Sequence, residues 1–377
     1  MTEMEVFSSA ESAFEKIDSL GGYANPGAVV PLKGVAAHEV AVGPVHAGVI
    51  EPGHFRFQCM GEDVYNLQIF LGYQHRGVEA AIVSADGNLP RQIALAETCA
   101  GDTSAAAATA FAELMERVFP ARFASPGAEA LRMRTLLLEL ERIANHVGDL
   151  GALAGDVAFV QTQAFCGRIR GEYLNMTALL CGNRFARNSI VPGGVRVALE
   201  DPKVAQLKDW IGRTKPELDR ALKLMFDEHS VCDRFEGTGV VPRDVARGAG
   251  LVGVARRASE EFCGDVMARA LVRRIEIDEA HSKIAAILEG EQVSAVRQEK
   301  VDSAGKFVCV SSSVAAWRGP LVHAAVFAPD GKMLRYKIVD PSAHNWPGLA
   351  WALRGEQISN FPICNKSFNL SYCGTDR

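Results

Sequence analysis

The chain has 377 residues, of which 48% are hydrophobic and 23% are charged, close to the average for globular proteins. This composition excludes a disordered or fibrous chain. Its 40 Lys and Arg residues against 45 Asp and Glu residues give a formal net charge of −5. That balance argues against a nucleic-acid-binding protein and against a polybasic membrane anchor.

No apolar run reaches the roughly 18 residues that a membrane-spanning helix needs, so no direct membrane span is expected. The first 20 residues carry four Glu and one Asp against one Lys and have no apolar centre, which is not the pattern of a signal peptide. The nine Cys residues are scattered and no two form a C-x-x-C pair. The cysteines therefore predict neither a disulfide framework nor a self-contained zinc or iron–sulfur site.

The predicted elements begin with an N-terminal arm over residues 1–40, followed by a single domain over residues 41–377. Within the arm, residues 10–20 form an amphipathic piece and residues 21–34 a linker with Gly and Pro. Residues 42–73 alternate between apolar and polar side chains and predict strands, with a hairpin turn at residues 61–63.

Helical periodicity starts at residue 91. The expected long helices cover residues 91–117, 128–153, 157–181, 201–230 and 263–288. Between and after them the pattern predicts a loop at 190–195, an irregular stretch at 233–253, short strands at 307–310, 321–328 and 333–339, a short helix at 346–354 and a coil at 360–377. The expected fold class is α+β and mostly α, a helical bundle with small β-sheets near the N-terminus and near residues 307–339.

Polar residues that could carry chemistry gather in a few segments rich in Gly and Pro. The first is VGPVHAGVIEPGHFRF at residues 42–57, and the second is LGYQHRGVE at residues 71–79. The third is a pair at opposite ends of the domain, ETCAGDTS (97–104) and NKSFNLSYCGTDR (365–377), each with one cysteine. Each segment alone is also compatible with a polar turn or with a buried core cysteine.

Taken in order, these segments resemble the large subunit of membrane-bound group 4 [NiFe] hydrogenases and the related quinone-site core subunit of respiratory complex I. The resemblance extends from about residue 42 to residue 377 and includes LLLELERIANHVGDLG, VPGGVR, FEGTGVV and the terminal TDR. Several ordered motifs with matching spacing make the signal specific. The resemblance implies the fold of a hydrogenase large subunit for the domain.

The resemblance also shows which metal ligands are missing. These hydrogenases hold nickel and iron with four thiolates from two C-x-x-C motifs, because soft thiolates suit both metals. The matching positions here are Cys99, Asp102, Ser371 and Gly374, and Cys373 is one residue out of register. We therefore expect vestigial ligand positions, no metal and no cofactor bound by this chain. The hydrogenases also carry a C-terminal extension that is removed after nickel insertion, and the end of this sequence at TDR agrees with that expectation.

Complex I implies a second kind of site, in which a histidine and a tyrosine hydrogen-bond the quinone head group. The histidine matches His54, and the aspartate before the tyrosine matches Asp102. The tyrosine itself is replaced by Thr103, whose hydroxyl stands on a short, non-aromatic side chain. This replacement argues against quinone binding in the manner of complex I, and a quinone is one candidate acceptor among others.

Three further residues match family positions. Glu51 matches the glutamate that transfers protons to and from the hydrogenase site, and Arg318 matches the arginine above the nickel. Arg76 matches an arginine beside the [4Fe–4S] cluster of the neighbouring small subunit, where its charge would raise the reduction potential of the cluster. The alternatives are an exposed carboxylate for Glu51, an edge-strand arginine for Arg318, and for Arg76 a salt bridge to Glu79.

We expect a cavity where the 99–102 loop meets residues 371–377. The expected lining is Glu51, His54, Thr103 and Arg318, with Asp376 buried nearby. The resemblance further implies a buried, charged central helix that carries Glu139, Glu141, Arg142, His146 and Asp149. The alternative for these residues is a solvated stripe on the helix surface.

The sequence thus predicts the large subunit of a membrane-associated oxidoreductase related to complex I and to hydrogenases, without the [NiFe] centre. The resemblance implies a small [4Fe–4S] partner subunit, membrane subunits that translocate ions, a quinone or another acceptor, and a cytoplasmic position on the inner face of the membrane. Whether the chain is itself an enzyme stays open, and it is not expected to be a hydrogenase. The alternatives are an active group 4 [NiFe] hydrogenase subunit and a non-catalytic structural subunit.

Overall fold

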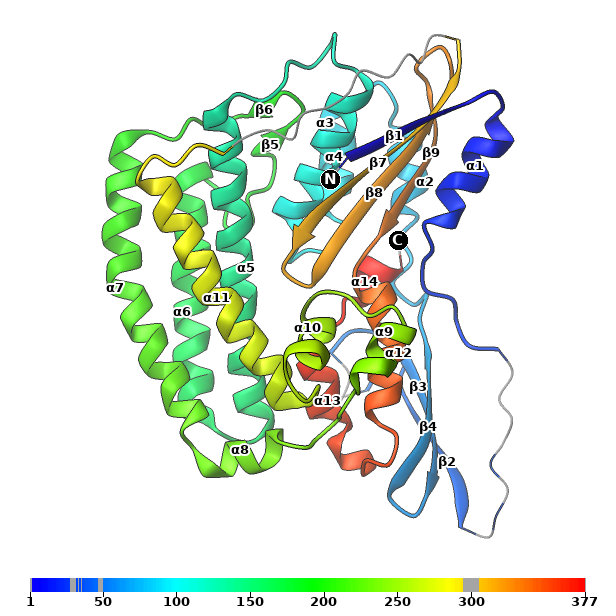
Figure 1. Cartoon of the computed structure of the whole chain (residues 1–377), viewed down its shortest axis with the longest axis vertical. Helices are drawn as coiled ribbons and strands as arrows, with labels where there is room; N and C mark the ends of the chain where they lie inside the picture. The colour runs from blue at the N-terminus through cyan, green and yellow to red at the C-terminus, as the bar shows by residue number, and fades with distance from the viewer. Residues whose placement is uncertain are drawn as a thin grey trace.

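The computed structural model describes residues 2–27, 32, 34, 36–46, 50–293 and 305–376 of the chain. A bundle of long helices stands beside a layer of small sheets and short helices (Figure 1). The bundle consists of α5 (Ala128–Asp156), α6 (Val160–Cys181), α7 (Asp201–Phe226) and α11 (Val266–Leu288). None of the helices in these described ranges is both long enough and apolar enough to cross a membrane.

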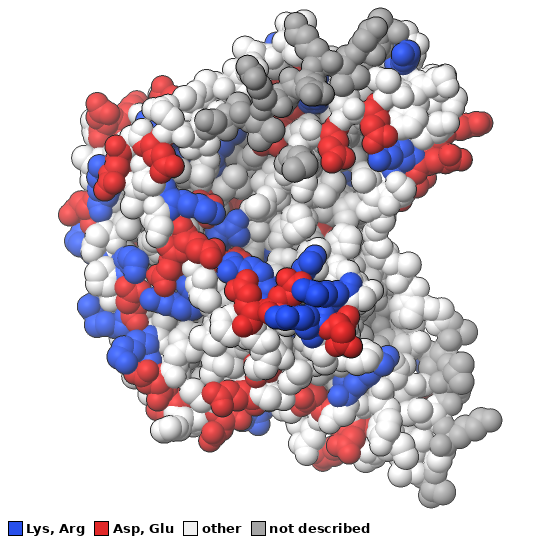
Figure 2. All heavy atoms as spheres, in the orientation of Figure 1, with Lys and Arg blue, Asp and Glu red and all other residues white. Residues whose placement is uncertain are grey.

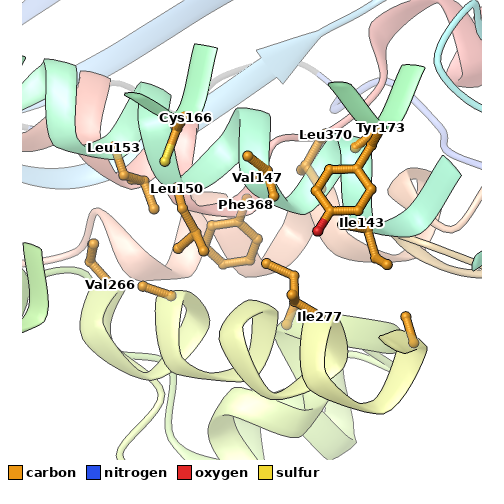
Figure 3. Close-up of a cluster of buried hydrophobic side chains, with 14 of the residues drawn as sticks. Ile143, Val147, Leu150, Leu153, Cys166, Tyr173, Val266, Ile277, Phe368 and Leu370 are labelled. Carbon is orange, nitrogen blue, oxygen red and sulfur yellow. The ribbon is translucent and has the colours of Figure 1, made fainter. Parts of the chain in front are cut away.

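Helix α5 is the centre of the bundle because its apolar residues recur every three or four positions. This spacing places one stripe of side chains in the core; it comprises Leu136, Leu140, Ile143, Val147 and Leu150, all fully buried. Figure 3 shows part of this cluster between α5, α6 and α11, with the ring of Phe368 from the C-terminal region inserted into it. The bundle therefore holds the C-terminal segment in place.

A four-stranded antiparallel sheet in the order β1-β7-β8-β9 forms the upper part of the side layer (Figure 1). Its strands are β1 (Thr2–Phe7), β7 (Phe307–Ala316), β8 (Gly319–Phe327) and β9 (Met333–Val339). Helix α1 (Ala10–Ser19) packs on one face, and α2 (Val78–Ser84) and α4 (Ser104–Val118) pack on the other. The N-terminal arm thus contributes β1 and α1 to this layer, and β1 pairs with β7.

A three-stranded antiparallel sheet forms the lower part, with β2 (Ala37–Val42), β3 (His54–Met60) and β4 (Asp63–Phe70). Phe55 and Phe57 are fully buried, and because side chains alternate along a strand, His54 and Arg56 belong to the opposite face. The predicted turn at 61–63 joins β3 to β4, and Gly61 takes a positive φ of 65° there.

Shorter elements join these parts. They are α3 (Leu89–Glu97), β5 (Ile190–Val191), β6 (Gly194–Val195), α8 (His229–Phe235), α9 (Arg243–Gly248), α10 (Gly253–Glu261), α12 (Ser342–Ala352), η1 (Ile358–Asn360), α13 (Phe361–Phe368) and α14 (Tyr372–Thr375). On the face drawn in Figure 2, acidic and basic side chains are intermixed. On α10, Arg257 forms ion pairs with Glu261 and Glu279.

The predicted fold class, α+β and mostly α, is confirmed. The helix predicted at 91–117 is wrong in one respect, because it is two helices, α3 and α4, separated by residues 98–103. The new start at Ser104 is stabilised from outside, since Glu141 of α5 accepts hydrogen bonds from the amides of Ala105 and Ala106. The predicted coil at 360–377 contains α13 and α14, and the stretch 233–253 contains α9.

Candidate functional site

The centre of the candidate site is an ion pair between Asp102 and Arg318. Arg318 lies in the tight turn between β7 and β8, and Asp102 lies in the loop between α3 and α4. The two Nη atoms of Arg318 lie 2.9 and 2.7 Å from the two carboxylate oxygens of Asp102. The Arg318 side chain is 5% exposed and that of Asp102 is 34% exposed. The pair is thus bidentate, with its carboxylate side open to solvent.

Burial by itself would raise the pKa of Asp102, but the charge and hydrogen bonds of Arg318 outweigh it and lower that pKa below its ordinary value. The Thr103 hydroxyl adds to this, because it donates to Asp102 Oδ1 over 2.9 Å. Arg318 Nη1 in turn lies 3.4 Å from Thr103 Oγ1. The structure therefore brings together three of the residues singled out in the sequence, and Asp102 is ionised at neutral pH.

Two residues that the sequence analysis missed hold the backbone of this loop. Asn145 Nδ2 on α5 and Trp317 Nε1 donate to the Asp102 carbonyl over 2.8 and 3.1 Å. The Arg318 guanidinium also stacks 3.9 Å above the Trp317 ring. Asn145 lies within the quoted central-helix motif, but its partner is a loop 43 residues away, which no local pattern indicates.

On the C-terminal side, Glu51 approaches the short helix α14. Its Oε2 accepts a hydrogen bond from the Cys373 amide over 3.2 Å. Burial raises the pKa of Glu51 above its ordinary value, although the Cys373 amide and the charge of Arg318 oppose this. Ser371 is the N-cap of α14, and its hydroxyl accepts a hydrogen bond from the Gly374 amide over 2.9 Å.

The four positions that match the nickel ligands do not fit a [NiFe] centre. Cys99 is 1% exposed and packs in an apolar cluster, both Asp102 oxygens bind Arg318, and the Ser371 hydroxyl caps α14. At Gly374, a Cβ atom would lie 2.5 Å from Oδ2 of Asp340. Within the described ranges, no three His, Cys, Asp or Glu side chains are arranged to hold a metal ion.

His54 and Arg76 have other surroundings. His54 Nδ1 lies 3.3 Å from the Gly43 carbonyl, and its ring packs against Phe70; none of these contacts reaches Asp102. The Arg76 guanidinium donates to the carbonyls of Thr98 and Cys99 over 2.8 and 2.9 Å. Arg76 thereby ties its own loop to the end of α3, and its exposed side chain remains at the surface.

Asp376 is 6% exposed, as expected. Its two carboxylate oxygens accept hydrogen bonds from the amides of Gly72 and Gln74 over 2.7 and 2.9 Å. The C-terminal segment therefore holds the loop that carries Arg76. Arg377 lies outside the described residues.

The central helix α5 is buried and charged, as the resemblance implied. Arg142 pairs with Glu139 over 3.0 Å, and His146 Nε2 lies 2.8 Å from Glu276. Burial lowers the pKa of His146. In Glu276 burial would raise the pKa, but His146 and the neighbouring arginines lower it to about 2.

Asn369 connects this charged helix to the candidate site. Its carbonyl accepts from Arg318 Nε over 2.6 Å, and its amide donates to Asp149. Asp149 also pairs with Arg273 over 2.9 Å. Asn369 has a φ of 45°, a left-handed conformation that Asn tolerates better than most residues. Its place at the end of α13 fits this conformation, but no local sequence pattern indicates its contact with Arg318.

The open side of Asp102 faces a groove of about 380 Å³ between α5 and α6. The polar residues that line it are Asp102, Asn145, Asp149, Gln163, Arg170 and Asn369. Arg318 links the 99–102 loop to the C-terminal region through Asp102 and the Asn369 carbonyl. The expected cavity between that loop and residues 371–377 stays a prediction.

Comparison with known proteins identifies relatives of this chain. Residues 156–263 match the family model described as the 49 Kd subunit of respiratory-chain NADH dehydrogenase. Hydrogenase-4 component G of Escherichia coli K12 is 25% identical over 90% of this chain and 62% of its own length. The chain thus spans less than two thirds of that relative.

Other relatives are matched over most of their length. The carbon monoxide-induced hydrogenase of Rhodospirillum rubrum is 24% identical over 91% of this chain and 100% of its own length. NADH-quinone oxidoreductase subunit 4 of Thermus thermophilus is 26% identical over 84% of this chain and 88% of its own length.

A solved structure, that of the membrane-bound sulfane sulfur reductase, an archaeal respiratory membrane complex, contains a chain with the same fold. The TM-score is 0.76 at 22% identity, over 91% of this chain and 99% of that chain. As its motifs predicted, the chain is related to the large subunits of group 4 hydrogenases and to the corresponding subunit of NADH-quinone oxidoreductase.

Proposed function

We propose that this protein is the large subunit of a membrane-associated oxidoreductase complex that has lost the [NiFe] centre of its hydrogenase relatives. A small partner subunit with a [4Fe–4S] cluster exchanges electrons with an acceptor bound near Asp102, a quinone or another small molecule. Membrane subunits couple this transfer to ion translocation, and the chain lies on the cytoplasmic face of the membrane through these partners. The relatives, which are subunits of hydrogenases and of NADH-quinone oxidoreductase, support this assignment.

The observation that carries the proposal is the internal ion pair of Asp102 and Arg318, because Asp102 stands at a position that matches a thiolate ligand of the hydrogenases. Both carboxylate oxygens of Asp102 bind Arg318, so neither oxygen is free for a metal. A Cβ at Gly374 would lie 2.5 Å from Asp340 Oδ2, so Asp340 would have to shift before a side chain could stand there. Asp102 would have to leave Arg318 before its carboxylate could bind a metal.

The remaining polar groups suit proton and hydrogen-bond chemistry at a bound acceptor. Asp102 and Arg318 together are neutral, and the exposed side of the carboxylate can accept a hydrogen bond from a ligand. Glu51 holds a proton more readily than an exposed glutamate because burial raises its pKa, as a proton-transfer group requires. Arg76 ties its surface loop to the end of α3. The resemblance implies that the [4Fe–4S] cluster of the partner subunit lies beside this arginine.

The test is electron transfer in the complex purified with its small subunit. We expect that dithionite reduces the cluster, that an added short-chain quinone or another acceptor reoxidises it, and that no hydrogen–deuterium exchange activity is detected. Hydrogen-dependent reduction of the cluster would contradict the proposal and favour the active-hydrogenase alternative.

The structural-subunit alternative has its own outcome in the same experiment. If no acceptor reoxidises the cluster faster in the complex than with the small subunit alone, the chain contributes only an interface. The Asp102→Asn variant gives the matched comparison, because a functional site loses rate when this carboxylate is changed and an interface does not.

A further inference from the structure

The groove between α5 and α6 has an uncompensated positive charge. Asp102 is paired with Arg318 and Asp149 with Arg273, so these four groups contribute no net charge. Arg170 is the remaining charged residue of the lining. Within the part of the chain that the structure describes, its side chain forms neither a hydrogen bond nor an ion pair.

Arg170 is held in position although it has no polar partner among the described residues. It is half-buried, and the stem of its side chain lies on α5 at Gly148, where a Cβ atom would come within 2.9 Å of Arg170 Cδ and 3.1 Å of Nε. A guanidinium with five N–H donors and a supported stem is suited to bidentate binding of a planar or tetrahedral oxoanion.

The rest of the lining argues for a small polar ligand. Ala152 is the largest apolar side chain among the described residues that line the groove, and Gly148, Gly151 and Gly167 expose backbone. The side-chain amide of Gln163 also forms no hydrogen bond within the described residues and offers a further donor. A neutral head group with an apolar tail would find few apolar partners here, whereas a volume of about 380 Å³ accommodates a compact molecule.

We propose that this groove binds a small molecule through an oxoanion group, a carboxylate or a phosphate, that Arg170 holds beside the Asp102–Arg318 pair. The inference rests on the proposed function, since it names the ligand class of the same site, but its test measures binding and not electron transfer. Nickel in the protein would therefore refute the proposed function without deciding the test of the groove.

The experiment is isothermal titration calorimetry of the full chain, with the subunits that co-purify with it, against inorganic phosphate and against acetate at constant ionic strength. We expect saturable binding of at least one of these anions and a loss of about tenfold or more in affinity in Arg170→Gln. Arg170→Lys keeps the charge but loses the bidentate geometry, so its affinity is expected to be intermediate.

Arg168→Gln is the matched control. It removes the same charge from the same helix, but Arg168 is exposed and paired with Glu217 outside the groove. Its affinity is expected to be that of the unmodified chain, and circular dichroism checks that each variant is folded. Equal binding by Arg170→Gln, absence of saturable binding by the unmodified chain, or tighter binding of a short-chain ubiquinone that does not depend on Arg170 would each overturn the proposal.

Discussion

Asp102 and Arg318 are 216 residues apart in the sequence and form the most completely paired group of the candidate site. The arginine donates to both carboxylate oxygens and to the Asn369 carbonyl. The carboxylate in this position is therefore a structural partner of Arg318. This role can be tested by removing the charge.

For Asp102→Asn we expect the free energy of unfolding to fall by roughly 2 kcal/mol at pH 7, below the ~3–5 kcal/mol typical of a fully buried pair because the carboxylate is partly exposed. The folded-state pKa of Asp102 is lowered, so its contribution is present above the unfolded pKa of about 3.9 and is lost as pH falls through the folded value. Urea titrations at pH 7, 5 and 3.5 measure this. A difference between the two proteins that grows on acidification would contradict the ion-pair account.

Gly374 lies in tightly packed surroundings that can be tested by adding a side chain. A Cβ at this position would lie 2.5 Å from Asp340 Oδ2 and 2.8 Å from the Ser371 hydroxyl, so Gly374→Ala is expected to cost about 1–3 kcal/mol of unfolding free energy. Gly374→Cys should be destabilised in the same way and should not gain nickel.

A double-mutant cycle tests whether Asp340 causes the steric clash at position 374. Combining Gly374→Ala with Asp340→Ala should recover part of the loss, with a coupling energy of at least about 0.5 kcal/mol. Additive effects of the two changes would show that the carboxylate of Asp340 does not occupy the space that a side chain would need.

At the scale of elements, the seam between α5 and α6 decides the shape of the groove. At Gly151, a Cβ would lie 2.7 Å from Cys166 Cβ, which brings the two backbones close together. Gly148 supports the Arg170 stem in the same way one turn earlier. Glycines on α5 thus allow both the close approach of α6 and the position of the Arg170 side chain.

Gly151→Ala should destabilise the protein by about 1–3 kcal/mol, because the added methyl group overpacks the seam. Gly212→Ala on α7 is the control, since nothing lies within 4 Å of its added Cβ; it should be stabilising by about 0.5–1 kcal/mol, the usual gain for Gly to Ala in a helix. Thermal unfolding followed by circular dichroism measures both. Equal changes in stability for Gly151→Ala and Gly212→Ala would show that α5 and α6 can move apart without cost to accommodate the added methyl group.

The loop that carries Arg76 depends on the side-chain carboxylate of Asp376. In Asp376→Asn the charge-assisted hydrogen bonds to the Gly72 and Gln74 amides weaken, and hydrogen exchange at these two amides should accelerate at least about tenfold. Asp330→Asn, in an exposed turn where Asp330 accepts from the Lys332 amide, should leave exchange at Gly72 unchanged. Unaltered exchange in Asp376→Asn would show that other contacts hold the loop.

In the whole molecule, the long helices and the fold class could be predicted from hydrophobic periodicity, because α5 repeats its apolar residues at helical spacing. The break between α3 and α4 could not be predicted in this way, since Glu141 of another helix stabilises the start of α4. The pairing of β1 with β7 joins segments about 300 residues apart, and no local pattern indicates such a contact.

The site was predictable to a similar extent. The motifs singled out Asp102, Thr103 and Arg318, which the structure brings together. The sequence did not indicate Asn369, Asp340 or Arg170, because their contacts are with residues far away in the chain. The Asn369 carbonyl binds Arg318, Asp340 lies against Gly374, and Arg170 lines the groove. His54 lies on the strand face opposite Phe55 and Phe57, and its role in binding a quinone stays a prediction.

We propose that an internal ion pair has replaced the nickel site. The most direct measurement is the nickel and iron content per chain of the complex purified with its small subunit, by inductively coupled plasma mass spectrometry. We predict no nickel above background and iron in the amount of the partner's [4Fe–4S] cluster. About one nickel per chain would refute this proposal, because Asp102 would then have to leave Arg318 to make room for the metal.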